Sequence, residues 1–87
     1  MPIMIGFAAR RRELLDAELK RMATKLSTLG VERSYLIGDL ANDAVSVSSP
    51  LELVLIHKTT EPFHRRADFF VTHLRPMVET LFFVYTP

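Results

Sequence analysis

The sequence contains no cysteine. This absence excludes disulfide bonds, zinc ribbons, iron–sulfur clusters and thiol nucleophiles together. A strong excess of charge is also missing, because eleven Lys and Arg residues face ten Asp and Glu residues, a formal net charge of +1. Tight nucleic-acid binding needs a patch of cations, and the only run, Arg10–Arg12, is followed by Glu13 and Asp16. We interpret this run as a solvated helix face and expect no strong nucleic-acid binding.

A membrane segment is not expected either. Residues 1–9 are mostly apolar, and the cations follow them instead of preceding them. A signal peptide has the reverse order, and nine residues are too few to cross a hydrocarbon core of about 30 Å. We expect a cytoplasmic protein.

The composition that remains is that of one small globular domain over residues 1–87. Apolar residues make up 48% of the chain and charged residues 24%, close to the average of folded proteins. A domain of this length buries only a little over roughly 60% of the surface that its unfolded chain exposes. Its stability is therefore marginal unless a partner covers more surface, which makes oligomerisation an early expectation.

Two segments have the apolar spacing of amphipathic helices. The first is predicted over residues 7–29 and ends at Gly30, with its charged side chains on the other faces. Its apolar positions are Leu15, Leu19, Met22, Leu26 and Leu29. The second is expected to be capped by Thr59 or Thr60, with Glu61 and Pro62 in its first turn, and to end at Pro76. Its apolar positions are Phe63, Ala67, Phe70, Val71 and Leu74.

Three segments, 31–37, 51–57 and 80–85, have the composition of strands. The apolar end of the first, Tyr35–Ile37, is expected to be buried. The second is apolar on both sides, which is typical of a central strand covered by helices. Between these two lies a polar loop over residues 39–50, with room for one helical turn at its start.

The element order predicts an α+β fold. Strands joined across a helix are parallel, whereas strands joined by a loop pair more economically as antiparallel neighbours. We therefore expect a small mixed three-stranded sheet with both helices packed on it.

The segment from Tyr35 to Ile56 resembles the signature of the minimal nucleotidyltransferases, relatives of DNA polymerase beta. In that family a strand leads into Gly-Ser, a short helix ending Ala-Arg-Gly, a loop, Ser-Asp-x-Asp-Leu and an apolar strand. Here the corresponding stretches read Ile-Gly-Asp, Ala-Asn-Asp and Ser-Pro-Leu-Glu-Leu. The Tyr-Thr-Pro sequence at residues 85–87 is similar to the one that follows the family's third strand. The resemblance implies a nucleotidyltransferase-like fold.

The resemblance also implies positions for the chemistry. In the family, strand carboxylates hold two magnesium ions, and the Gly-Ser turn cradles a triphosphate. Gly38 keeps the glycine of that turn, but Asp39 replaces the serine and places a negative charge where phosphate would lie. Asn42 and Asp43 replace the arginine and the glycine. Of the three carboxylate positions, only Glu52 keeps an acid, since the other two fall at Pro50 and Leu81.

A single carboxylate does not make a two-metal site, so the first hypothesis is a degenerate domain that has lost catalysis and acts as a binding or assembly module. The nucleotide-binding candidates are Gly38 and Asp39, and the metal candidates are Glu52, Asp39 and Asp43. The alternative is an active nucleotidyltransferase that uses Glu52 with Asp39 or Asp43 and magnesium. An unrelated α/β module with a chance match also stays open.

Other chemistry has weaker support. His57, His64 and His73 have no metal-ligand spacing, and the loop serines at 46, 48 and 49 lack the glycines of a nucleophile elbow. The aromatic residues have no interleaved cations, so we expect them in the core or at an interface. The hydrophobic strand 80–85 supports an interface, and we predict a homodimer or a complex with a small helical HEPN-type partner, which the resemblance implies.

Overall fold

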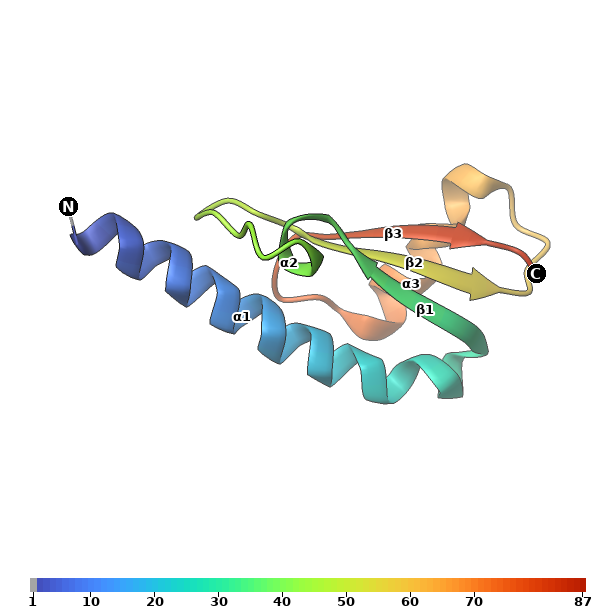
Figure 1. Cartoon of the computed structure of the whole chain (residues 1–87). Helices are drawn as coiled ribbons and strands as arrows, with labels where there is room; N and C mark the ends of the chain where they lie inside the picture. The colour runs from blue at the N-terminus through green and yellow to red at the C-terminus, as the bar shows by residue number, and fades with distance from the viewer. Residues whose placement is uncertain (1) are drawn as a thin grey trace.

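The longest element is helix α1, Pro2–Leu26. The computed structural model describes the backbone of residues 2–87 and the side chains of residues 6–87. The helix begins five residues before the predicted start, with Pro2 in its first turn, where a missing N–H costs no hydrogen bond. A 3₁₀ turn, Ser27–Leu29, follows, and Gly30 ends it with φ 88°, as the sequence predicts. The N-terminal half of α1 extends beyond the sheet (Figure 1).

The three strands form one sheet in the order β1-β2-β3. They span Val31–Ile37, Leu51–His57 and Thr80–Tyr85. β1 pairs antiparallel with β2, and β2 pairs parallel with β3 across helix α3, Arg66–Leu74. The mixed α+β sheet and the strand directions are confirmed. The helical turn at the start of the loop is also present, as α2, Gly38–Ala41.

The core lies on one face of this sheet, which we call the inner face. Alternating residues of β2, namely Leu51, Leu53 and Leu55, are at most 2% exposed. They form one cluster with buried residues of both long helices, so α1 and α3 cover the same face. These residues are Leu15, Met22, Leu26, Phe70 and Leu74. The prediction that helices cover β2 on both sides was wrong, because Val54 and Ile56 on the opposite face are only half-buried.

The expected burial of the end of β1 was also wrong. Tyr35 is 48% exposed and Ile37 is 38% exposed, while Leu36 between them packs against the core. β1 is an edge strand, and after the register shift its side chains at Arg33, Tyr35 and Ile37 point away from the helices. In this hydrophobic segment at the sheet edge, Leu36 is therefore covered, whereas Tyr35 and Ile37 are exposed.

Helix α3, Arg66–Leu74, begins later than the sequence suggested. Thr59 does not cap it: its Oγ1 accepts a hydrogen bond from the N–H of Glu61 (3.1 Å) in the preceding turn. Pro62 is extended, and a 3₁₀ turn, Phe63–Arg65, precedes the helix. This tighter turn changes the helical phase, so Phe63 stays exposed. The centroids of the Phe63 and Tyr85 rings lie 5.4 Å apart. Phe70 and Leu74 are buried as predicted, whereas Val71 is exposed.

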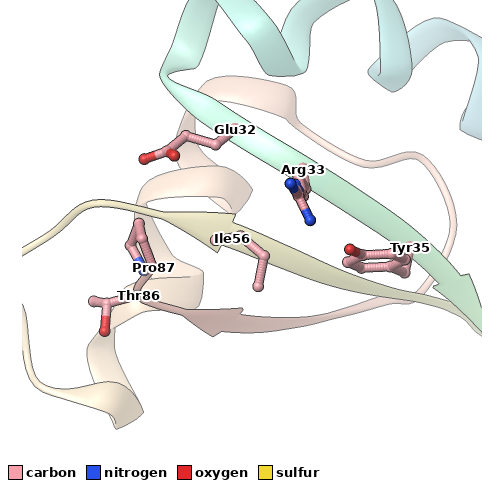
Figure 2. A pocket seen from close by; sticks show the side chains of 6 residues that line it. All are labelled: Glu32, Arg33, Tyr35, Ile56, Thr86 and Pro87. Carbon is pink, nitrogen blue, oxygen red and sulfur yellow. The ribbon is translucent and has the colours of Figure 1, made fainter.

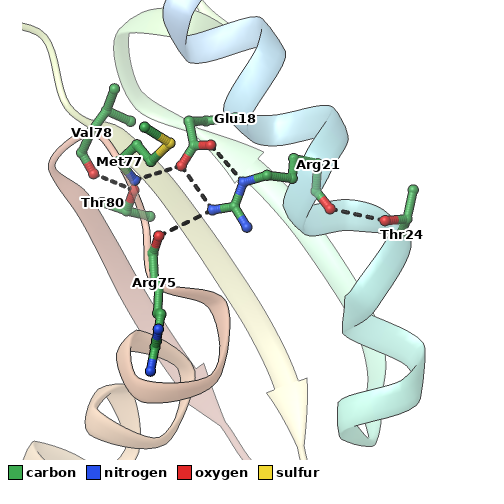
Figure 3. A network of polar contacts seen from close by, with 7 residues as sticks. All are labelled: Glu18, Arg21, Thr24, Arg75, Met77, Val78 and Thr80. Carbon is green, nitrogen blue, oxygen red and sulfur yellow. Dashed lines mark hydrogen bonds and ion pairs between the residues drawn. The ribbon is translucent and has the colours of Figure 1, made fainter.

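A buried carboxylate joins α1 to the segment that leads into β3 (Figure 3). Glu18 accepts hydrogen bonds from Nε and Nη2 of Arg21 (2.7 and 3.0 Å) and from the N–H of Met77 (2.7 Å). Arg21 also donates to the carbonyl oxygen of Arg75 (3.3 Å). The bond from Arg21 lowers the pKa of Glu18 against the opposing effect of burial. The prediction that every charge of this helix lies on its solvated faces was therefore wrong for Glu18.

Candidate functional site

One face of the sheet is left uncovered by the helices and is open to a ligand or partner. The strand registers place nine side chains on it in three rows. We call this the outer face. Its rows are Ile37, Glu52 and Leu81; then Tyr35, Val54 and Phe83; then Arg33, Ile56 and Tyr85. Seven of the nine side chains are apolar or aromatic, and one acid and one base occupy opposite end rows.

Gly38, the first nucleotide-binding candidate, lies against Glu52. It has φ 80°, and a Cβ built on it would lie 1.8 Å from Oε2 of Glu52. Only glycine fits this position without moving the carboxylate, and a positive φ is strained for other residues. Gly38 and Glu52 thus lie in contact, at the start of a helix of four residues.

Asp39, the second candidate, turns toward the loop. Its Oδ2 accepts a hydrogen bond from Oγ of Ser49 (2.7 Å). The same Oγ of Ser49 accepts a hydrogen bond from the N–H of Ser46 (2.8 Å). Ser49 is 2% exposed. The carboxylate therefore holds the loop closed and satisfies a buried hydroxyl, which is a structural use of the acid.

Asp43 lies on the other side of the same loop. Its Oδ1 forms an ion pair with Arg12 of α1, and its backbone has a φ of 55°. The neighbouring Arg11 donates from Nε to the carbonyl oxygen of Ser49 (2.8 Å). The interpretation of the arginine run as a solvated face holds for Arg12, whose side chain is 45% exposed, whereas the half-buried Arg11 attaches the loop to the helix.

The three metal candidates are not gathered into a common site. Asp39 and Asp43 bind protein groups, and Glu52 lies on the outer face. Over residues 6–87, no group of three His, Asp or Glu side chains has a geometry that could hold a metal ion. Glu52 pairs in register with Leu81, so two of the three positions where the family would have carboxylates are neighbours, and one of them is apolar.

A pocket of about 380 Å³ opens at the opposite end of the outer face (Figure 2). Arg33, Tyr35 and Ile56 form its floor, with Glu32 on one side and residues 86–87 on the other. A register shift between Val31 and Arg33 places an extra residue, Glu32, at this end of β1. Sequence reasoning missed the pocket. The alternation of Arg33, Tyr35 and Ile37 was a signal that these side chains share one face of the strand. The register shift that positions the pocket depends on the pairing of β1 with β2.

Two of the three histidines, His57 and His73, have structural contacts, and His64 is exposed. The His57 ring stacks on Phe69 with 5.6 Å between centroids, and its Nδ1 lies 3.1 Å from the carbonyl oxygen of Gly30. Nδ1 of His73 lies 2.8 Å from the carbonyl oxygen of Phe69. These contacts position α3 against the sheet and do not form a ligand set.

Comparison with known proteins gave no relative. No family model matches the sequence, and no curated protein or solved structure is significantly similar to it. Among the helices described for residues 2–87, none has the length and apolar character needed to cross a membrane.

Proposed function

We propose that the chain is a cytoplasmic, nucleotidyltransferase-like domain that has lost catalysis and acts as a binding or assembly module through its outer face. The observation that carries the proposal is the uncovered outer face itself. Seven apolar or aromatic side chains share it, and Tyr35 and Tyr85 are 48% and 47% exposed. Contiguous apolar surface of this kind marks interaction sites in soluble domains.

The chemistry of the outer face supports loss of catalysis. A two-metal site needs several oxygen ligands around each ion, and the end row offers Glu52 between Ile37 and Leu81. Asp39 and Asp43, the other two metal candidates, contact Ser49 and Arg12. A triphosphate approaching Gly38 would also meet the carboxylate of Glu52, which lies against that glycine.

A calorimetric titration with ATP, with and without magnesium, tests this proposal. We expect no saturable heat at millimolar ATP in either condition. Saturable, magnesium-dependent binding that Glu52→Ala abolishes would contradict it and favour the alternative, transfer of a nucleoside monophosphate from a magnesium-bound nucleoside triphosphate. Glu79→Ala is the matched control, because Glu79 is an exposed acid just before β3.

A further inference from the structure

The two charges of the outer face lie at opposite ends of the sheet. Glu52 is in one end row, and Arg33 is in the other, two residues along each strand from the middle row. Over the side chains of residues 6–87, neither residue takes part in an ion pair. Within its three rows, the apolar face therefore presents Arg33 and Glu52 at opposite ends, and Glu32 lies at the side of the pocket next to Arg33.

This arrangement is complementary to itself. Consider two copies stacked face to face, related by a two-fold axis that runs across the strands. Each end row of one copy then lies against the other end row of its partner. The two middle rows lie against each other. Arg33 then lies beside the partner's Glu52, and the same contact is repeated at the other end. An axis along the strands would instead place Glu52 against the partner's Glu52, and like charges at an interface are strongly unfavourable. We propose that the outer face binds a second copy of this chain, face to face, with its strands antiparallel to those of the first.

The shape of the face agrees with this orientation. The pocket of about 380 Å³ lies at the Arg33 row. The two-fold axis places over it the partner's row of Ile37, Glu52 and Leu81, whose apolar members are each 38% exposed. The projecting side chains of one end row thus face the hollow of the other. In the middle row, Tyr35, Val54 and Phe83 supply the apolar centre that interfaces between copies usually have.

The size of the face sets the strength of the complex. Three strands of about six residues, at spacings of about 4.8 and 3.3 Å, give a face of about 14 by 20 Å. This is below the roughly 800 Å² per partner of a standard interface. We therefore expect a reversible dimer that dissociates on dilution through the micromolar range. The inference rests on the proposed function, since a face that bound a nucleotide would not be free for a second copy.

Charge exchange across the interface tests the proposal by sedimentation velocity between about 1 µM and about 1 mM, the range of a small reversible interface. Wild type should shift from monomer to dimer. Arg33→Glu and Glu52→Lys should each weaken the dimer at least about tenfold, because each brings like charges together twice. The double variant should restore dimerisation, and an equimolar mixture of the two single variants should form heterodimers, since each chain then supplies the charge that the other lacks.

Arg65→Glu is the matched control, because it reverses an exposed arginine on the 3₁₀ turn before α3. It should dimerise as wild type does. Equal weakening by Arg65→Glu, or failure of both the double variant and the mixture to recover, would overturn the face-to-face geometry. A wild-type chain that stays monomeric throughout would overturn the second copy as occupant while leaving the proposed function intact if ATP also fails to bind. Magnesium-dependent ATP binding would overturn both.

Discussion

The two faces of the sheet are made by alternating residues of the same three strands, but they have opposite surroundings. On β3, Phe82 is buried beneath the helices and its ring lies 5.8 Å from Phe70, whereas its neighbour Phe83 faces outward and is half-buried. Both side chains are equally hydrophobic. The difference comes from the placement of α1 and α3, because buried residues of both helices pack on the inner face. The inner face therefore holds the fold together, while the outer face leaves apolar side chains exposed.

The neighbouring phenylalanines of β3 offer the sharpest test of this division. Phe82→Ala should lower the free energy of unfolding by about 3–5 kcal/mol, since it leaves a cavity in the core. Phe83→Ala should cost the monomer only about 1 kcal/mol, the typical effect of a partly exposed site. Urea denaturation at low micromolar protein compares the two. Equal losses would show that the outer face is as important to folding as the inner one.

Two glutamates extend the comparison to charge. Glu18→Gln should cost about 1.5–3 kcal/mol at pH 7, because the carboxylate accepts charge-assisted hydrogen bonds from Arg21 and the N–H of Met77. Glu52→Gln should stay within about 0.5 kcal/mol, as is usual for a surface site without partners. Denaturation curves of both variants and wild type provide the measurement.

The pH dependence of stability separates the same two residues. The pKa of Glu18 in the folded state is below its ordinary value of 4.5. The folded state therefore binds this proton less readily than the unfolded state, and the stabilisation is present above pH 4.5 and lost as the pH falls through the folded pKa. Wild type should lose more stability than Glu18→Gln on acidification below pH 4.5. Parallel pH profiles would contradict the role given to Glu18.

A smaller effect than the loss of Phe82 or Glu18 is expected at the glycine beneath Glu52. Gly38→Ala should destabilise the fold by about 1–2 kcal/mol, because its positive φ is strained for alanine and the new Cβ displaces the carboxylate. Gly6→Ala is the matched control: that glycine lies within α1 and has open space around it, so the same change should stabilise by about 0.5–1 kcal/mol. Thermal unfolding of both variants measures the two changes in stability. Changes of the same sign would contradict this account.

The sequence predicted the elements better than their surroundings. Strand directions followed from the connections, since a helix between β2 and β3 and a loop between β1 and β2 leave few alternatives. The burial of Leu15, Met22 and Leu26 followed from helical spacing. The uncovered face was not foreseen because Val54 and Phe83 are as hydrophobic as the buried residues beside them, and only the positions of both helices distinguish them.

The candidate site was predicted less well because its contacts join residues far apart in the chain. Arg12 meets Asp43 across 31 residues, and Asp39 meets Ser49 across ten. No local pattern marks such pairs. The contact between Gly38 and Glu52 depends on the pairing of β1 with β2, and the opposite placement of Arg33 and Glu52 depends on the register shift near Glu32.

Cross-linking through a single introduced thiol tests the central claim, that two copies meet through the outer face, most directly. The chain has no cysteine, so Val54→Cys places one thiol at the centre of that face, where the two-fold axis brings it against its own copy. Thr72→Cys places one on the exposed side of α3. With a short bis-maleimide, the account predicts covalent dimers from Val54→Cys at concentrations where Thr72→Cys gives none, and their loss when Arg33→Glu is added. Equal yields from the two thiols, or none from Val54→Cys, would contradict it.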